Sequence, residues 1–264
     1  MKNILVPIGS SENSINTLQY AIDFAHEVGA AVFVLRAYNV QSKAGTIIDV
    51  NAILERESNL YMRSMINSVD RKGQDIQLIS AQGNVVDSIA SIDKEIGIDL
   101  VMMGPKSNSI KEEVFLGATS GSVVKQSDIP VLIVPESYAF KPFSSVLTAF
   151  KSGVVNKKDV LKPLQFVKNK FNPVINLLLV KTPGYVEADL EIDDALISLK
   201  SSLKITENAT TFQGVLEHFQ SNNPDMLCVF RRKRGFFKKL WEKNTIAKKE
   251  FHCSVPLLVL SGKA

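Results

Sequence analysis

The chain contains an internal repeat whose two copies keep the same spacing. Asp99 precedes one apolar run and Pro130 opens the next, and Asp225 and Pro256 do the same 126 positions later. Two landmarks at one offset indicate a repeat with no net insertion between them. The copies agree in their apolar runs and differ in the segment between, which reads GPKSNSIKEEVFLGATSG in the first copy. The sequence therefore predicts two domains of one fold with different sites.

Each copy alternates short apolar runs with longer amphipathic stretches. In the first copy Leu100–Met103 is typical of a buried strand and Gly117–Gln126 of a helix; in the second copy the pattern favours a helix over 186–200. Such alternation requires right-handed crossovers and gives a parallel sheet with helices on both faces. We therefore predict an α/β fold of two doubly wound parallel-sheet domains, 1–138 and 143–264.

Composition excludes several classes of protein. The hydrophobic content of 45% is that of a chain with a buried core, and the apolar runs have strand length, far below the roughly 20 residues that span a bilayer. The N-terminal MKNILVPIGSS is typical of a first strand and not of a signal peptide. The two cysteines, Cys228 and Cys253, do not form a disulfide framework, which favours a reducing cytoplasm. We expect a cytoplasmic protein that does not associate with membranes.

A candidate site follows from the parallel sheet. Ligands bind beyond the carboxyl ends of parallel strands, here the ends of the first two strands and the loop after the fourth. In that loop Gly104 would let the backbone approach a phosphate, and a helix beginning near Gly117 would point free N–H groups at an anion. The alternative is that Gly104 and Gly117 serve only the turn and the helix start.

With these features the chain resembles the universal stress protein family in its tandem two-domain form. The resemblance covers nearly the whole chain: the repeat, the segment Asp99–Gly104 and the closing strand Pro130–Pro135. It implies adenine-nucleotide binding, of ATP or AMP, in a protein of the stress response. In nucleotide-binding members the loop has Gly, two residues, Gly, nine residues, Gly, then Ser or Thr. The residues at or beside these positions are Gly104, Ser107, Gly117, Ala118 and Thr119.

The resemblance also implies roles for the strand ends. The family uses an aspartate at the end of the first strand to bind the ribose and adenine, and Gly9 stands there in this chain. Pro7 and Ala37 would lie near the base. Because hydrogen bonds to charged groups contribute roughly 1.5–3 kcal/mol, Gly9 in place of the aspartate is expected to weaken binding. Ser107 and Ala118 are further departures from the motif.

The second copy has lost the motif. The positions 126 residues beyond those of the first loop hold Phe230, Lys233, Lys243 and Asn244. We expect the second domain to be a structural partner, or to bind a different ligand.

The second copy is also basic: residues 143–264 carry 19 Lys and Arg against 11 Asp and Glu, whereas residues 1–142 carry 12 against 16. Segment 231–249 alone holds nine basic residues. The simplest interpretation of this segment is a solvated loop and the polar face of a helix. It contains no recognised nucleic-acid module, so we expect no sequence-specific binding of DNA or RNA. A nucleotide-free interaction scaffold that uses this basic face is the alternative function.

Catalytic and metal chemistry find no support. His26, His218 and His252 lack ligand spacing with Cys, Asp or Glu, so we expect no structural metal. A GxxxxGK[ST] loop is absent, and the serines have no plausible His–Asp partners. We expect a binding protein and not an enzyme, and a slow nucleotide hydrolase ranks below both binding hypotheses.

The last strand of each domain lies at a sheet edge if the strand order is 3-2-1-4-5. Exposed edges favour pairing with another strand. The resemblance implies that 131–134 and 257–260 pair with each other within one chain. Homodimerisation is the other way to cover such an edge.

Overall fold

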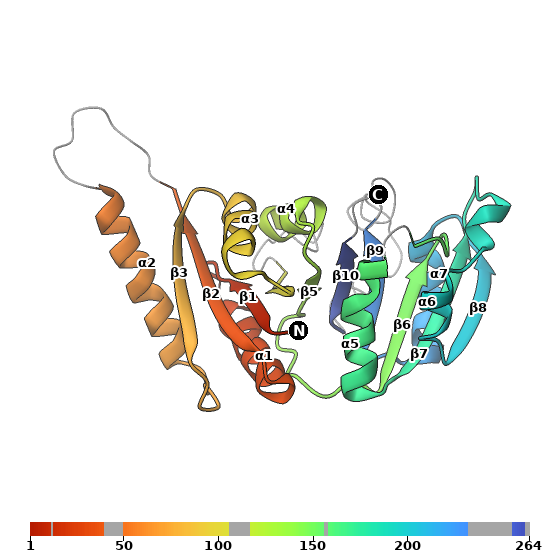
Figure 1. The fold of residues 1–264 in the computed structure, drawn as a ribbon, viewed down its shortest axis with the longest axis horizontal. Helices are drawn as coiled ribbons and strands as arrows, with labels where there is room; N and C mark the ends of the chain where they lie inside the picture. Colours follow the sequence, from red (N-terminus) through yellow and green to blue (C-terminus); the bar gives the residue numbers. More distant parts are fainter. Residues whose placement is uncertain (12, 40–49, 106–116, 156–157, 232–254, 262–264) are drawn as a thin grey trace. The chain divides into compact units, whose positions relative to one another are not determined.

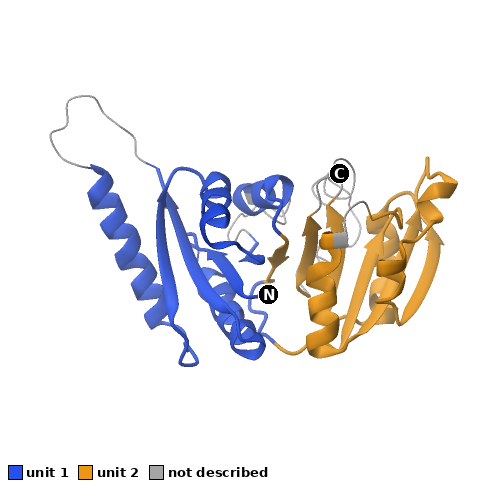
Figure 2. Cartoon of the chain, viewed as in Figure 1, with its two compact units in different colours: residues 1–108, 116–129, 136–140 blue, residues 109–115, 130–135, 141–264 orange. Residues whose placement is uncertain are grey.

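The computed structural model describes residues 1–11, 13–39, 50–105, 117–155, 158–231 and 255–261. The chain forms two compact units (Figure 2). The first contains 1–108, 116–129 and 136–140, and the second contains 109–115, 130–135 and 141–264. Residues 130–135, which belong to the first repeat by sequence, thus fall in the second unit. The basic segment 231–249 lies outside the described residues apart from Arg231.

The first unit is a parallel sheet with the strand order β3-β2-β1-β4 (Figure 1). Right-handed crossovers in this order place α1 and α2 on one face and α3 and α4 on the other. Its elements are β1 (Asn3–Pro7), α1 (Asn13–Val28), β2 (Ala31–Tyr38), α2 (Val50–Asn67), β3 (Ile76–Gln82), α3 (Val85–Ile96), β4 (Leu100–Met103) and α4 (Gly117–Gln126).

The second unit has the strand order β5-β10-β9-β6-β7-β8. Its strands are β5 (Val131–Ile133), β6 (Ser145–Phe150), β7 (Val174–Lys181), β8 (Ser202–Glu207), β9 (Met226–Arg231) and β10 (Leu257–Ser261). Its helices are η1 (Lys158–Leu161), α5 (Lys162–Phe171), η2 (Glu187–Leu190), α6 (Asp194–Ile197) and α7 (Thr211–Asn222). The order β8-β7-β6-β9-β10 is the predicted 3-2-1-4-5. The predicted pairing of the two closing strands is confirmed: β5 runs antiparallel to β10, with Leu132 opposite Leu258.

The predicted helix over 186–200 is wrong. The segment forms only the short turns η2 and α6, separated by extended backbone. Asp193 is extended and its side chain accepts a hydrogen bond from the N–H of Ala195, which starts α6 there. Asp189 likewise accepts from the N–H of Val186. Short acidic side chains compete for backbone donors in this way, so they start helices and interrupt longer ones.

The repeated aspartates have the same structural role in both units. The Oδ2 atom of Asp99 accepts the N–H groups of Lys2 and Asn3, where β1 begins. The Oδ2 atom of Asp225 accepts the N–H groups of Ser144 and Ser145, where β6 begins. Each aspartate therefore ties its own strand to the start of the first strand of its unit.

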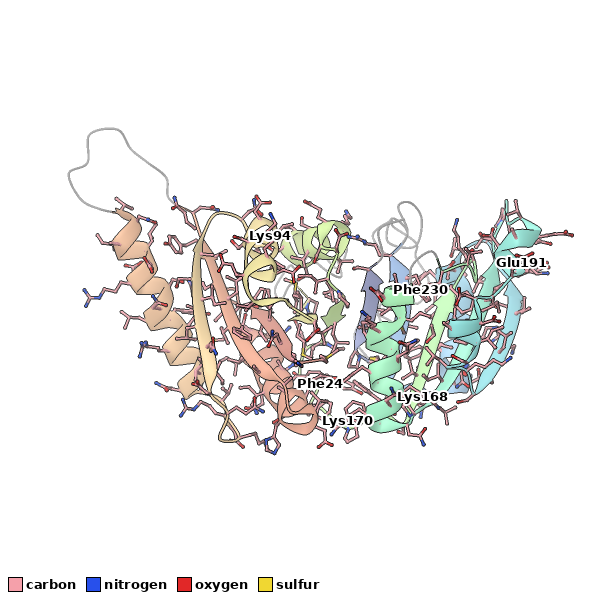
Figure 3. The ribbon with its side chains drawn as sticks, viewed as in Figure 1. Phe24, Lys94, Lys168, Lys170, Glu191 and Phe230 are labelled. Atoms are coloured by element: carbon pink, nitrogen blue, oxygen red, sulfur yellow. The ribbon has the colours of Figure 1, made fainter. Side chains whose placement is uncertain are left out.

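An aromatic cluster anchors the connecting segment to the first unit. The ring of Phe140 meets those of Tyr20 and Phe24 edge to face, with centroids 5.5 Å apart in both pairs. Both partners lie on α1, where Phe24 is labelled in Figure 3. Burial raises the pKa of Tyr20 well above its usual value, and Tyr138 acts in the same direction. The cluster fixes residues 136–140 against α1.

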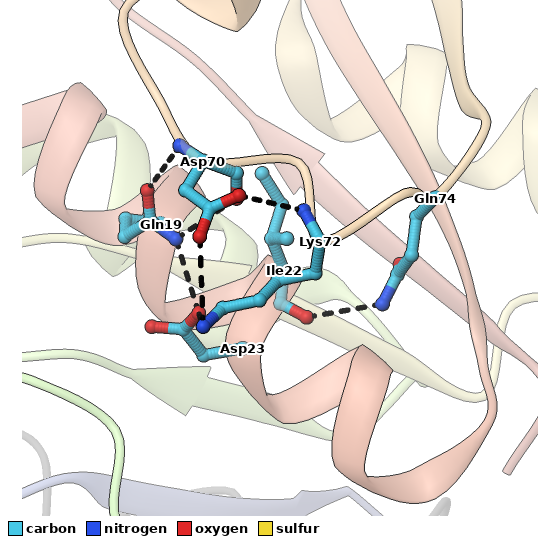
Figure 4. Close-up of polar contacts among 6 residues, drawn as sticks. All are labelled: Gln19, Ile22, Asp23, Asp70, Lys72 and Gln74. Atoms are coloured by element: carbon cyan, nitrogen blue, oxygen red, sulfur yellow. Dashed lines mark hydrogen bonds and ion pairs between the residues drawn. The ribbon is translucent and has the colours of Figure 1, made fainter.

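The turn between α2 and β3 is held against α1 by polar contacts (Figure 4). The Gln19 side chain accepts from the N–H of Asp70 and donates to its carbonyl. The Asp70 carboxylate accepts from the N–H of Lys72, and the Lys72 ammonium lies 3.6 Å from it. Lys72 adopts a left-handed backbone with φ of 53°, so these bonds hold a turn that few L-residues favour.

In the described part of the chain no helix is both long and apolar enough to cross a membrane.

Candidate functional site

The end of β1 is open at Gly9, the position at which the resemblance noted above implies an aspartate. Pro7 is half-buried at the end of β1, and the N–H of Ile8 donates to the carbonyl of Leu35, 2.8 Å away. Gly9 is exposed, and a Cβ built on it would meet nothing within 4 Å. Its φ lies outside the left-handed region. Neither packing nor backbone conformation therefore requires glycine at position 9, and a longer side chain would fit.

The carbonyl of Gly9 is fixed by two hydroxyl groups. Ser14 of α1 donates to it over 3.2 Å and Tyr61 of α2 donates over 2.9 Å. The guanidinium carbon of Arg36, near the end of β2, lies 3.7 Å from the centroid of the Tyr61 ring. At this distance the cation lies against the face of the ring, a cation–π arrangement. Position 9 is thus linked through Tyr61 to a positive charge.

Polar side chains at the start of α1 are buried without partners in the described part of the chain. Among the residues that the structure describes, the amide of Asn13 has neither a donor nor an acceptor within hydrogen-bond distance, and the hydroxyl of Thr17 also has none. Asn13 is 8% exposed and Thr17 is 2% exposed. The buried Nη1 atom of Arg36 is the third such group near this edge. A buried polar group without a partner costs about 1–3 kcal/mol. A stable fold retains such groups most readily where another molecule completes them.

Gly104, which follows β4, lies directly against two of these groups. A Cβ at this position would meet Asn13 Nδ2, and it would lie 2.8 Å from Thr17 Oγ1. The Ser120 hydroxyl of α4 donates to the Gly104 carbonyl over 2.8 Å. The close approach of α1 is therefore sufficient reason for glycine here, which supports the packing interpretation of Gly104. The same approach brings the starts of α1 and α4 to one strand end.

The other predicted site residues are placed as follows. Ala37 is half-buried beside Arg36 in β2. Gly117 is the first residue of α4, and Ala118 and Thr119 are exposed in its first turn. Ser107 lies outside the described residues. The structure thus places both Gly9 and Gly104 against the start of α1, through Ser14 and Asn13 respectively.

Sequence reasoning missed Asn13, Thr17 and Tyr61, and it placed Arg36 at the end of the second strand without giving it a role. One signal was available: Asn13 and Thr17 lie four residues apart, on the helix face that continues to the buried Ala21. Polar residues in an apolar stripe are unusual enough to mark a site. The contact of Arg36 with Tyr61 joins separate elements, and no local pattern announces it.

The second unit closes the corresponding edge with its own chain. The N–H of Gly153, in the loop after β6, donates to the carbonyl of Asp189, and the N–H of Asp193 donates back to the carbonyl of Gly153. A Cβ on Gly153 would lie 2.5 Å from the Cα atom of Ile192. Glu191, which is labelled in Figure 3, is the residue before Ile192 in the chain. Segment 187–193 therefore lies where a ligand would approach the end of β6.

Apolar packing replaces the loop motif in the second unit. Phe230, at the position that corresponds to Gly104, packs edge to face against Phe150 with centroids 6.1 Å apart. Cys228, on the same strand β9, is fully buried. Burial raises the pKa of its thiol to about 12, although the Thr148 hydroxyl acts in the opposite direction. Such a thiol stays protonated and unreactive.

Within the described ranges, no group of three or more His, Cys, Asp or Glu could hold a metal ion.

Comparisons with known proteins agree with this architecture. The model of the universal stress protein family matches residues 1–135. A universal stress protein of Methanocaldococcus jannaschii is 23% identical over 138 residues, covering 50% of this chain and 81% of that protein. A stress response protein of Bacillus subtilis is 26% identical over 163 residues, covering 50% and 96%.

A solved structure of similar extent shows that both units share the fold. The crystal structure of a universal stress protein from Archaeoglobus fulgidus covers 98% of this chain and 96% of its own, with 21% identity and a TM-score of 0.68. The family model matches half of the sequence and the fold extends over nearly all of it. The chain belongs to the universal stress protein family.

Proposed function

We propose that the first unit binds an adenine nucleotide at the carboxyl edge of its sheet. The observation that carries this proposal is the pair of buried side chains beside Gly104, Asn13 and Thr17, whose polar atoms have no hydrogen-bond partner among the described residues. A ligand with donors and acceptors at this edge would complete them and remove a cost of about 1–3 kcal/mol for each group.

Helix starts supply the phosphate-binding part of the proposal. α1 begins at Asn13 and α4 begins at Gly117, and the N-terminal ends of helices carry free N–H groups and partial positive charge. Glycine at position 117 adds no side chain that would block a phosphate at the first turn of α4. The exposed Thr119 offers a hydroxyl one residue beyond Ala118, the position where the family has Ser or Thr.

The proposal is binding or sensing, with little or no turnover. No described residue near Gly104 is placed as a general base for an attacking water, so hydrolysis is not part of the proposal. The second unit binds no nucleotide in this account, because segment 187–193 lies against Gly153. We also propose that the protein is cytoplasmic, because its two cysteines do not form a disulfide framework.

Isothermal titration of the full chain with ATP and with AMP tests this function. We expect one nucleotide per chain. Gly117→Val should abolish the heat of binding, since a β-branched side chain blocks the approach to the helix start, and the unfolding midpoint should change little. Thr211→Val, the same kind of side chain at the first residue of α7 in the second unit, is the matched control and should bind normally. Unchanged affinity in Gly117→Val would remove this loop as the site.

A further inference from the structure

We propose that Arg36 binds a phosphate on the ribose of the ligand, so that the site prefers ribose-phosphorylated adenine nucleotides to simple ones. This inference rests on the proposed function and specifies its ligand. It starts from a reversal of charge: at the end of β1 the expected carboxylate is missing, and an arginine linked to the same carbonyl through Tyr61 is present.

The geometry makes Arg36 a recognition group and not a structural ion pair. Among the described residues no carboxylate forms an ion pair with Arg36, and its buried Nη1 atom has no hydrogen-bond acceptor. Ser80, opposite Arg36 on β3, does not accept from this atom; its hydroxyl bonds with Ser58 and Asn59 of α2. A buried, unpaired guanidinium donor is costly, and an anionic ligand would relieve that cost.

Tyr61 holds the guanidinium for this purpose. Its hydroxyl is fixed on the Gly9 carbonyl and its ring lies under the guanidinium at 3.7 Å. Stacking uses the face of the cation and leaves its edge, where the N–H groups lie, to form paired hydrogen bonds with a phosphate. Arg36 is half-buried, so water screens it less than it screens an exposed side chain.

The absence of a side chain at Gly9 sets the direction of the preference. A carboxylate at this position would accept hydrogen bonds from ribose hydroxyls and would repel a ribose phosphate. Gly9 leaves open space there, with nothing within 4 Å of a built Cβ. A ribose that carries a phosphate thus gains the arginine and avoids repulsion, whereas a plain ribose lacks its charged partner.

The test compares adenosine 3′,5′-bisphosphate and adenosine 2′,5′-bisphosphate with AMP by isothermal titration of the full chain. We expect at least one bisphosphate to bind about tenfold more tightly than AMP, the effect of a charge-assisted hydrogen bond. Arg36→Met keeps an apolar stem over Tyr61 and should remove the preference for the bisphosphates over AMP. Arg36→Lys should restore only part of it, because an ammonium cannot form the paired contact.

Lys94→Met is the matched control, since it removes one positive charge from the exposed last turn of α3 and should keep the preference. Equal affinities for AMP and both bisphosphates would overturn this inference and leave the nucleotide function standing. A preference that survives in Arg36→Met would also overturn it. Binding of none of the three probes would contradict the nucleotide function itself.

Discussion

Asp225 holds Ser144 at two points, accepting its backbone N–H over 2.8 Å and its hydroxyl over 2.6 Å. The other carboxylate oxygen lies 2.5 Å from the Lys141 ammonium. Burial alone would raise the pKa of Asp225, but the bonds from Lys141, Ser144 and Ser145 outweigh it and lower the pKa to about 2. The start of the second unit is therefore fixed by one ionised carboxylate.

This arrangement predicts a loss of stability in acid. The unfolded pKa of an aspartate is near 3.9, so the contribution is full above that value and disappears as pH falls towards about 2. We expect Asp225→Asn to lower the free energy of unfolding by about 1–2 kcal/mol at pH 7, a discounted value because Lys141 is mostly exposed. The difference from wild type should shrink between pH 4 and about pH 2.

Denaturant unfolding at several pH values measures this effect. Asp159→Asn is the control, since Asp159 pairs with Lys162 but its side chain is 78% exposed. It should cost little at any pH. A pH-independent loss in Asp225→Asn would show that the carboxylate acts through shape and not through charge.

The aromatic contact of Phe140 with α1 gives a second prediction. Phe140→Ala removes two edge-to-face contacts from a half-buried side chain and should destabilise the first unit by about 1–3 kcal/mol. It should also speed proteolysis within 136–142. Val186→Ala, at a residue that is 59% exposed, should change neither quantity. Unfolding curves of the two variants that coincide would exclude an anchoring role for Phe140.

Gly9→Asp should convert the ligand preference. The new carboxylate fits in open space and would accept the hydroxyls of a plain ribose, so AMP should bind about tenfold more tightly. The same charge should weaken binding of a ribose bisphosphate. Gly9→Ala fills the same space without charge and should leave both affinities nearly unchanged. If Gly9→Asp binds AMP no better than Gly9→Ala, the ribose does not lie at the end of β1.

The pairing of β5 with β10 predicts how a truncated chain assembles. A fragment of residues 1–141 keeps β5 but loses the strand that pairs with it. Because open strand edges favour pairing, we expect this fragment to form a homodimer through 131–134 at micromolar concentration. Light scattering that reports a monomer would contradict this.

Local sequence patterns predicted most of the fold. The strand Leu100–Met103 and the helix Gly117–Gln126 agree with the structure to the residue, because glycines mark the end of the first and the start of the second. The segment 186–200 could not be predicted this way. Its helical spacing is overridden by the side chains of Asp189 and Asp193 and by backbone bonds to Gly153, a partner distant in the sequence.

The candidate site was predicted less completely than the fold. The repeat and the glycines located the correct edge of the sheet, but the polar groups there depend on tertiary contacts. Asn13 is buried against Gly104, about 90 positions further along the chain, and Arg36 lies over Tyr61 on another element. Neither contact follows from a spacing rule.

The most direct measurement of the central claim uses Asn13→Leu, with affinity and stability determined on the same protein. If the buried amide of Asn13 exists to meet a nucleotide, an apolar side chain of similar size should raise the free energy of unfolding by about 1 kcal/mol and weaken ATP binding at least about tenfold. Thr148→Val, which replaces a buried hydroxyl in the second unit, should leave ATP affinity unchanged. Unaltered ATP affinity in Asn13→Leu would contradict a nucleotide site at the carboxyl edge of the first unit.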